Sequence, residues 1–191
     1  SWSNITNASD GGWLVGDATA LSSSSFPIDA HTTIAATNDD NCNCDKSNDI
    51  LSTGTIDLSG QTMVFMSFAS YFYDLSYQGI NEDGEVVVST DGGSTWTSVY
   101  TVPANTGSWQ TDLVDLSAYA GNASVQVGFK YNDNGGWLYG FAIDDVLIFA
   151  PQQGTDLAVT TTIIGKEDAR PVFTGYAKYL TGLPLTDYLL P

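Results

Sequence analysis

Strand-length apolar segments, separated by turns rich in glycine and aspartate, constrain the fold of this chain most. The segment TMVFMSFASYFY (residues 62–73) is apolar almost throughout, as expected for a central strand that is buried on much of both faces. In ASVQVGFKYN (residues 123–132), Val125, Val127, Phe129 and Tyr131 alternate with more polar residues, which is typical of a half-buried strand. Helical periodicity is nearly absent, so the pattern predicts an all-β protein with a jelly-roll β-sandwich.

Further strands are indicated on either side of a tight turn and near residue 150. GEVVVST and TSVYTV (84–90 and 97–102) flank the turn DGGSTW and predict a β-hairpin. The hairpin tip matches an Asp-box, formed by Ser89, Asp91, Gly93, Thr95 and Trp96. In that motif the aspartate accepts backbone hydrogen bonds and the tryptophan packs beneath the turn. A propeller would repeat the motif, whereas this chain has one copy, so we interpret it as structural and disfavour a sialidase.

The composition changes after the last long apolar segment, WLYGFAIDDVLIFA (137–150), which predicts a final strand. PQQG (151–154) is a plausible linker, and TDLAVTTTIIG (155–165) begins another strand pattern. We therefore expect residues 1–150 to form the jelly roll. Residues 151–191 are expected to be a linker and an additional C-terminal β segment, either the start of a second domain or an extension of the first. The chain is expected to be a piece of a larger protein.

The charge balance excludes several classes of function. The chain has 22 acidic and 5 basic residues, a formal net charge of −17. Nucleic-acid binding is excluded because no basic patch could neutralise phosphates, and membrane insertion is not expected because no apolar run reaches membrane-spanning length. A composition rich in Ser, Thr, Asn and Gly and poor in Lys and Cys is typical of a secreted or cell-surface protein.

Acidic and amide side chains are concentrated in TNDDNCNCDKSND (residues 37–49), where Lys46 is the only basic residue. Crowded carboxylates repel one another, so a folded protein must compensate their charge. Ca²⁺ takes about 6–8 oxygen ligands of this kind. The sequence predicts an irregular calcium site built from Asp39, Asp40, Asn43, Asp45 and Asp49. An EF-hand is excluded because Lys46 occupies its glycine position, and the alternative is a solvated turn without metal.

The only two cysteines, Cys42 and Cys44, lie within this acidic segment. A bent loop could join them in a disulfide, although an extended backbone would hold them at the upper limit of separation. A soft-metal site with His31 lacks a clear fourth ligand other than an aspartate. A catalytic Cys42–His31 pair is favoured even less, because neighbouring carboxylates raise the pKa of a thiol and so suppress the reactive thiolate.

Six motifs in order carry a family resemblance. They are HT (31–32), AATNDDNCNCDKSNDIL (35–51), IDLSG (56–60), VVVSTDGGSTW (86–96), Trp109 with VDLSAYAG (114–121), and YGFAIDDVLI (139–148). Together they resemble the cleaved-adhesin or choice-of-anchor jelly-roll modules of secreted and cell-surface proteins of Bacteroidetes-type bacteria, which are related in architecture to MAM domains. The resemblance covers roughly residues 10–150.

The resemblance implies a β-jelly roll with structural Ca²⁺ and a non-catalytic role in adhesion or substrate targeting, often beside a protease or glycosidase domain. It also implies that Asp144 and Asp145 help to bind the ion, and that residues after 154 begin an Ig-like domain. Carboxylates buried in an apolar strand would need a cation or hydrogen-bond donors. The alternative is an outward aspartate beside an inward one that caps a turn. The loop NDNGGW (132–137) is expected to reach the same rim.

Three hypotheses for function remain. The first is a calcium-stabilised adhesion module that recognises an extracellular glycan or protein. Aromatic residues that could stack on sugars, or simply pack in the core, are Trp13, Tyr71, Tyr73, Tyr77, Trp109, Trp137 and Tyr139. The second is a repeat unit of a surface filament or stalk that self-assembles through the C-terminal segment. The third, a jelly-roll glycoside hydrolase or lyase, is disfavoured because only three glutamates and one histidine are present.

Overall fold

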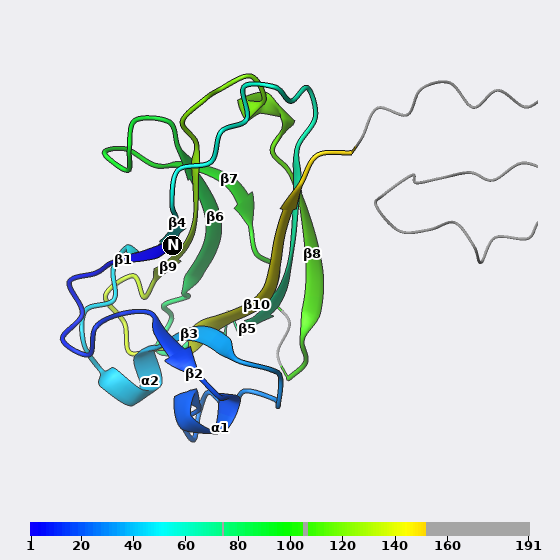
Figure 1. The fold of residues 1–191 in the computed structure, drawn as a ribbon. Helices are drawn as coiled ribbons and strands as arrows, with labels where there is room; N and C mark the ends of the chain where they lie inside the picture. Colours follow the sequence, from blue (N-terminus) through cyan, green and yellow to red (C-terminus); the bar gives the residue numbers. More distant parts are fainter. Residues whose placement is uncertain (74, 105–106, 152–191) are drawn as a thin grey trace, which may run out of the picture. The chain divides into compact units, whose positions relative to one another are not determined.

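Two five-stranded antiparallel sheets face each other in the computed structural model, which describes residues 1–73, 75–104 and 107–151 (Figure 1). The first sheet has the spatial order β1 (Trp2–Ile5), β4 (Asp49–Thr53), β9 (Gln126–Asn132), β6 (Asp83–Ser89) and β7 (Thr97–Thr101). The second has the order β2 (Leu14–Gly16), β3 (Ile34–Asn38), β10 (Gly140–Phe149), β5 (Phe65–Phe72) and β8 (Gln110–Asp115). The all-β jelly-roll prediction is confirmed.

Helical structure within the described residues is limited to single turns, and none of them could span a membrane. These are α1 (Ala18–Leu21), α2 (Asp39–Cys42) and the 3₁₀ turn η1 (Ser117–Tyr119). The turn η1 lies within the motif VDLSAYAG (114–121), and α2 lies within the acidic segment (37–49). Residues 152–191 lie outside the described part of the chain, so the predicted Ig-like segment and self-assembly through it stay predictions.

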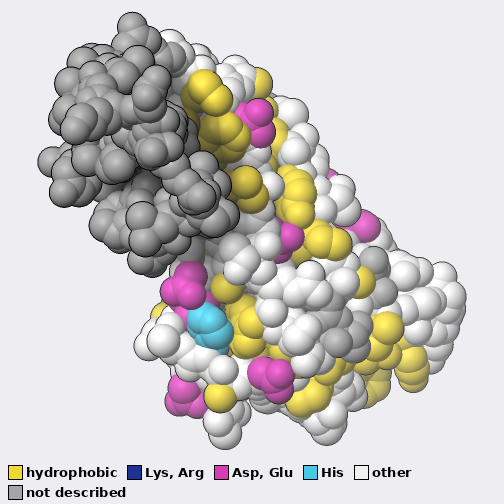
Figure 2. All heavy atoms as spheres, turned by 90° about the vertical axis from the view of Figure 1, so that its right-hand side faces the viewer, with side chains coloured by type: hydrophobic (Ala, Val, Ile, Leu, Met, Phe, Trp, Pro, Cys, Tyr) yellow, Lys and Arg dark blue, Asp and Glu magenta, His cyan; other side chains and the backbone are white. Residues whose placement is uncertain are grey.

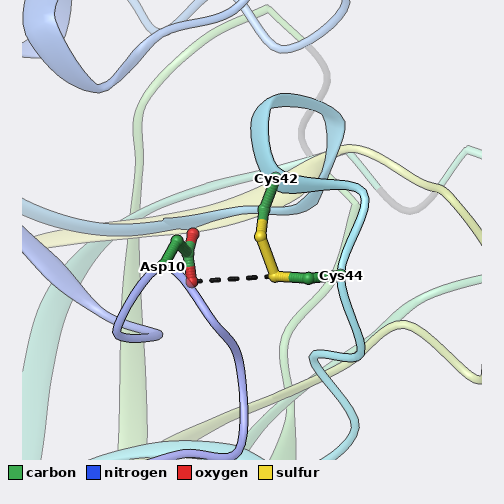
Figure 3. Close-up of side chains that lie close together, drawn as sticks. All are labelled: Asp10, Cys42 and Cys44. Atoms are coloured by element: carbon green, nitrogen blue, oxygen red, sulfur yellow. Dashed lines mark hydrogen bonds between the residues drawn. A yellow bond between two sulfur atoms is a disulfide. The ribbon is translucent and has the colours of Figure 1, made fainter.

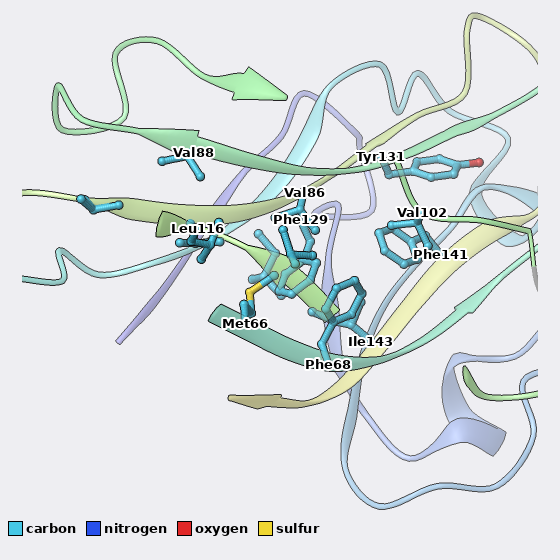
Figure 4. Close-up of a cluster of buried hydrophobic side chains, with 14 of the residues drawn as sticks. Met66, Phe68, Val86, Val88, Val102, Leu116, Phe129, Tyr131, Phe141 and Ile143 are labelled. Atoms are coloured by element: carbon cyan, nitrogen blue, oxygen red, sulfur yellow. The ribbon is translucent and has the colours of Figure 1, made fainter. Parts of the chain in front are cut away.

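The core between the sheets is built from the alternation that the sequence displays (Figure 4). Val127, Phe129 and Tyr131 of β9 are each at most 1% exposed. The Phe129 ring meets Phe68 of β5 edge-on, with 4.9 Å between ring centroids. Burying a side chain of this size contributes roughly 1.5–3 kcal/mol, so this interior holds the two sheets together.

The second sheet carries a smaller cluster on its outer face, where Phe26 packs against Tyr71 and Tyr73 of the β5 end. Elsewhere on this face apolar side chains reach solvent, such as Leu113 at 60% and Leu147 at 56% exposed (Figure 2). Tyr71 and Tyr73 are therefore packing residues. Of the two alternatives stated for them, packing in the core therefore holds, because both are more than nine-tenths buried.

The strands predicted within residues 62–150 are present, with shifted limits, whereas the strand predicted at 155–165 lies outside the described residues. The β6–β7 hairpin forms, and the Asp91 carboxylate accepts hydrogen bonds from the hydroxyl and backbone N–H of Thr95, which lower its pKa to about 2. The last strand starts at Gly140 instead of at residue 137. A Cβ at Gly140 would lie 2.4 Å from the Thr37 carbonyl oxygen, so only glycine allows β10 to approach β3 this closely. Residues 137–139 consequently remain in the β9–β10 loop.

Candidate binding site at the acidic loop

The acidic segment folds into α2 and a following loop, and this acidic loop (residues 38–48) ends where β4 begins. The Asn38 side chain caps α2 by accepting a hydrogen bond from Asn41 N at 3.0 Å, as asparagine at this position commonly does. Asn43 then adopts a left-handed conformation with φ of 46° and ends the turn. The backbone of this segment is thus shaped by local interactions of short polar residues, independently of tertiary contacts.

The start of α2 is hydrogen-bonded to the end of the β9–β10 loop (residues 133–139). The Tyr139 carbonyl accepts hydrogen bonds from Asp39 N at 2.9 Å and from Asp40 N at 3.2 Å. In return, Asp39 Oδ2 accepts the Leu138 amide hydrogen at 2.5 Å. The indole Nε1 of Trp137 donates to the Asp40 carbonyl at 3.1 Å. Two loops that are almost 100 residues apart in sequence are therefore fixed to each other.

Asp133, at the other end of the β9–β10 loop, accepts hydrogen bonds from the acidic loop as well. Its Oδ2 accepts from Lys46 N and its Oδ1 from the Ser47 hydroxyl, each at 3.0 Å. Glu82 completes the arrangement from the first sheet, because its Oε2 accepts from Tyr139 N at 3.1 Å. NDNGGW therefore reaches the acidic loop, whereas Asp144 and Asp145, which were expected at the same rim, lie beside His31 instead.

The Lys46 side chain is fully buried and acts as an internal counter-ion. Its ammonium lies 2.8 Å from Asp10 Oδ2 and 3.8 Å from Asp49 Oδ2. Burial raises the pKa of Asp49, whereas a hydrogen bond from Thr6 and the nearby Lys46 charge oppose the rise. A buried carboxylate is tolerated only when it is paired in this way. Part of the acidic charge is thus neutralised from within the chain.

Asp39 is fully buried, but its charge is compensated less completely. Its Oδ1 has no hydrogen-bond partner within the part of the chain that the structure describes. Burial raises the pKa of Asp39 to about 6, the hydrogen bond from Leu138 opposes this rise, and the nearby Asp133 charge adds to it. An unpartnered carboxylate oxygen in a buried position is costly, and this atom is one that could take a cation as a ligand.

The other residues predicted to bind calcium point to different places. Asp40 Oδ2 accepts the Ser25 amide hydrogen at 3.2 Å, and Asn43 forms the turn after α2. Asp45 is exposed, and its pKa is lowered by hydrogen bonding to Ser47, whose backbone N–H donates to Asp45 Oδ1 at 3.0 Å. Within the described residues, no three of the predicted carboxylates have oxygens within 4.8 Å of one another. Carboxylates alone therefore do not surround one ion here.

Cys42 and Cys44 form a disulfide, with 5.2 Å between their Cα atoms. The left-handed Asn43 bends the backbone enough to bring the two sulfurs together. Asp10 lies beside the bridge, and its Oδ1 is 3.9 Å from Cys44 Sγ (Figure 3). Because both sulfurs are oxidised, they cannot serve as thiolate metal ligands or as a nucleophile, and the alternatives that paired them with His31 are wrong.

Asp144 and Asp145 lie at a different corner, beside the only histidine (Figure 2). Asp144 Oδ2 is 2.6 Å from both His31 Nδ1 and the Thr32 hydroxyl. Burial alone would raise the pKa of Asp144, but the hydrogen bonds from Thr32 and His31 outweigh it and lower the pKa. Asp145 has φ of 51° at an irregularity in the β10–β5 pairing, and its side chain is 70% exposed. The expectation that both carboxylates are buried in the strand is wrong.

A surface hollow opens beside the acidic loop. It has a volume of about 180 Å³ and is lined by Ser25, Asp40, Tyr77, Trp137, Leu138 and Tyr139. Trp137 is 47% and Tyr77 is 45% exposed, whereas Trp13 is buried in the core. Trp109 packs against the His31 ring, with 4.6 Å between ring centroids, and lies outside the hollow. Of the predicted sugar-stacking residues, Tyr77, Trp137 and Tyr139 are therefore the ones that gather here.

Three residues that organise this site were not identified from the sequence. Asp10 and Lys46 form a contact across 36 positions, and Glu82 contacts Tyr139 across 57. The one available signal was Lys46 itself, a single basic residue among carboxylates. A lysine at that position is more often solvated than buried, so the sequence alone gave no reason to assign it as the counter-ion.

Comparison with solved structures places the fold among the cleaved adhesin domains. The K1 cleaved adhesin domain of Lys-gingipain from Porphyromonas gingivalis aligns with a TM-score of 0.57 and 20% identity, over 78% of this chain and 90% of that domain. The K3 domain gives 0.52 and 16% over the same shares, and the K2 domain gives 0.50 and 18% over 78% and 88%. Searches of protein-family models and of curated proteins found no match. The predicted resemblance is confirmed at the level of the fold.

Proposed function

We propose that residues 1–150 form a non-catalytic binding module of a secreted or cell-surface protein, with an extracellular glycan or protein as its ligand. The observation that carries this proposal is the exposed Trp137 on a loop whose backbone is fixed by hydrogen bonds to Asp39 and Asp133. An aromatic ring on a fixed loop is suited to recognition, because little conformational entropy is lost on binding. The shared fold with adhesin domains supports the same reading.

We propose further that Ca²⁺ stabilises this module at Asp39. The supporting observation is its buried, unpartnered Oδ1, and calcium commonly completes its shell with backbone carbonyls and water rather than with carboxylates alone. Bound Ca²⁺ would neutralise the Asp39 charge that burial disfavours. It would thereby stabilise the contact between the acidic loop and the β9–β10 loop.

The calcium proposal is tested by thermal melting of the chain in chelator and in excess Ca²⁺. We expect Ca²⁺ to raise the Tm of the wild type, because an ion that binds the folded state adds to its stability. Asp39→Asn should abolish this increase. The matched control is Asp45→Asn, an exposed acid of the same loop, which should keep it. An equal increase in Asp39→Asn would overturn the assignment to Asp39.

The binding function itself is tested by measuring association of the whole chain with a panel of glycans and of extracellular matrix proteins. We expect saturable binding to a member of the panel with no change in the ligand's covalent structure. Products released from a glycan on incubation would instead identify an enzyme. Absence of binding to every member would contradict the proposed function.

A further inference from the structure

We propose that the hollow beside the acidic loop is a saccharide subsite that stacks one neutral pyranose ring on Trp137. This inference rests on the proposed binding function and narrows it to one place and one class of ligand.

The Trp137 ring is exposed but held in one orientation. Its Nε1 donates to the Asp40 carbonyl, while its neighbour Leu138 is held by Asp39. The loop before it is equally constrained, because the Asn134 amide donates to the Asn81 carbonyl at 2.8 Å. The polarised C–H groups on one face of a pyranose match the electron-rich face of an indole. A ring fixed in advance can form such a stack at low entropic cost.

Tyr77 flanks the hollow from another segment. It belongs to a tight turn in which Tyr77 N donates to the Ile80 carbonyl and Ile80 N donates to the Tyr77 carbonyl, at 2.9 and 3.0 Å. Gln78 and Gly79 both have positive φ, as a two-residue turn of this kind requires. The turn contacts the β9–β10 loop, because a Cβ at Gly136 would lie 3.2 Å from the Ile80 side chain. Tyr77 is thus held near Trp137.

Polar groups around the rings are available to a ligand. Within the described residues, no hydrogen bond engages Asp40 Oδ1 or the hydroxyls of Ser25, Tyr77 and Tyr139. The carboxylate can accept from sugar hydroxyls, and the three hydroxyls can donate or accept. An apolar platform surrounded by a few such groups is the combination that fixes the orientation of a small polar ligand.

Charge and size narrow the ligand class. Among the described residues that line the hollow, one is a carboxylate, Asp40, and none is basic, so a uronic or sialic acid would be repelled. Its volume of about 180 Å³ is below the roughly 300–1,000 Å³ of pockets that enclose drug-sized ligands. It therefore fits a single sugar ring, with the rest of the glycan in solvent.

The subsite is tested with the full chain on an array of neutral and acidic glycans, beside an array of basic peptides. We expect binding to neutral glycans, and a decrease of roughly tenfold or more in Trp137→Ala. The matched control is Trp2→Ala, because Trp2 is 49% exposed and does not line the hollow. It should leave the affinity unchanged. Adding the bound glycan should also shift the Trp137 indole N–H resonance, identified by its loss in Trp137→Phe.

The outcomes separate this inference from the proposed function. Glycan binding that survives Trp137→Ala would overturn the subsite and leave the binding function standing. Binding to basic peptides or proteins that is lost in Trp137→Ala, with no glycan bound, would overturn the saccharide assignment alone. A preference for acidic glycans would contradict the charge argument. No binding by the wild type in any arm would overturn both proposals.

Discussion

The acidic loop and the corner at Asp144 carry the same chemical groups in opposite environments. Asp39 in the acidic loop and Asp49 at the start of β4 are fully buried, and the Lys46 ammonium that opposes Asp49 is buried with them. At the corner, Asp144 meets His31 near the surface, and Asp145 points into solvent. Aspartate side chains therefore affect the stability of the fold differently according to whether they are buried or exposed to solvent.

The comparison shows what the acidic loop does. Lys46 neutralises part of its charge inside the protein. Asp39 and the Lys46 backbone also hold the β9–β10 loop, through Leu138 and Asp133 respectively. The corner pair holds only the short segment at His31 and Thr32. Buried charges thus fix the orientation of an exposed surface, whereas the surface pair adds a local contact.

Replacing Lys46 should have the largest effect. Lys46→Met would leave Asp10 and Asp49 without their counter-ion, and removal of one partner from a buried ion pair costs about 3–5 kcal/mol. We expect a loss of this size in the free energy of unfolding, measured by chemical denaturation. Lys130→Met is the matched control, because Lys130 pairs with Glu85 in a part-exposed position.

The control should lose no more than about 1 kcal/mol, as is usual for ion pairs near the surface. If Lys46→Met costs no more than Lys130→Met, the internal counter-ion is not what stabilises the acidic loop. The acidic loop would then not differ from the surface corner in how much its ion pair stabilises the fold.

The two regions should also differ in the sign of their pH dependence. The folded-state pKa of Asp39 is raised to about 6, so its contribution to stability is full below pH 4 and is lost as the pH rises through 6. The pKa of Asp144 is lowered, so its contribution is present above pH 4 and is lost as the pH falls through its folded-state pKa. Stability curves of Asp39→Asn and Asp144→Asn, each compared with the wild type in chelator, measure the two contributions.

We expect the free energy of unfolding of Asp39→Asn to increase relative to that of the wild type between pH 4 and pH 7, by on the order of 3 kcal/mol. The free energy of unfolding of Asp144→Asn should be lower than that of the wild type by less than about 1 kcal/mol at neutral pH, and the difference should disappear below pH 4. The same sign of slope in both variants would contradict the contrast between a buried and a surface carboxylate.

The sequence was sufficient for the fold because the evidence for it is local. Alternation in residues 123–132 placed Val127 and Phe129 on one face, and the turn DGGSTW marked the β6–β7 hairpin. The sequence also indicated which loops form the rim. It did not indicate α2, because a one-turn helix has no periodicity and is formed here by the Asn38 cap and contacts with Tyr139.

The arrangement of the candidate site depends on contacts that no local pattern reveals. Lys46 reaches Asp10 across 36 positions, and the hollow joins Tyr77 to Asp40 and Trp137 from three separate segments. Asp144 and Asp145 lie in an apolar run, yet Asp144 pairs with His31 near the surface and Asp145, at the irregularity in β10, is exposed. These contacts follow from tertiary packing. Residue types therefore predicted which chemical groups are present at the site, but not how they are arranged.

The most direct test of the central claim is hydrogen exchange of the Leu138 amide, which donates to the buried Asp39 carboxylate. Asp39→Ala removes the acceptor, whereas Asp39→Asn keeps an oxygen for it. We predict that protection of this amide falls by roughly tenfold or more in Asp39→Ala, as loss of a hydrogen bond to a charged group implies. Protection should be retained in Asp39→Asn, with the β6–β7 hairpin unchanged in both. Equal protection of the Leu138 amide in the wild type and in Asp39→Ala would show that the acidic loop does not hold the β9–β10 loop in place.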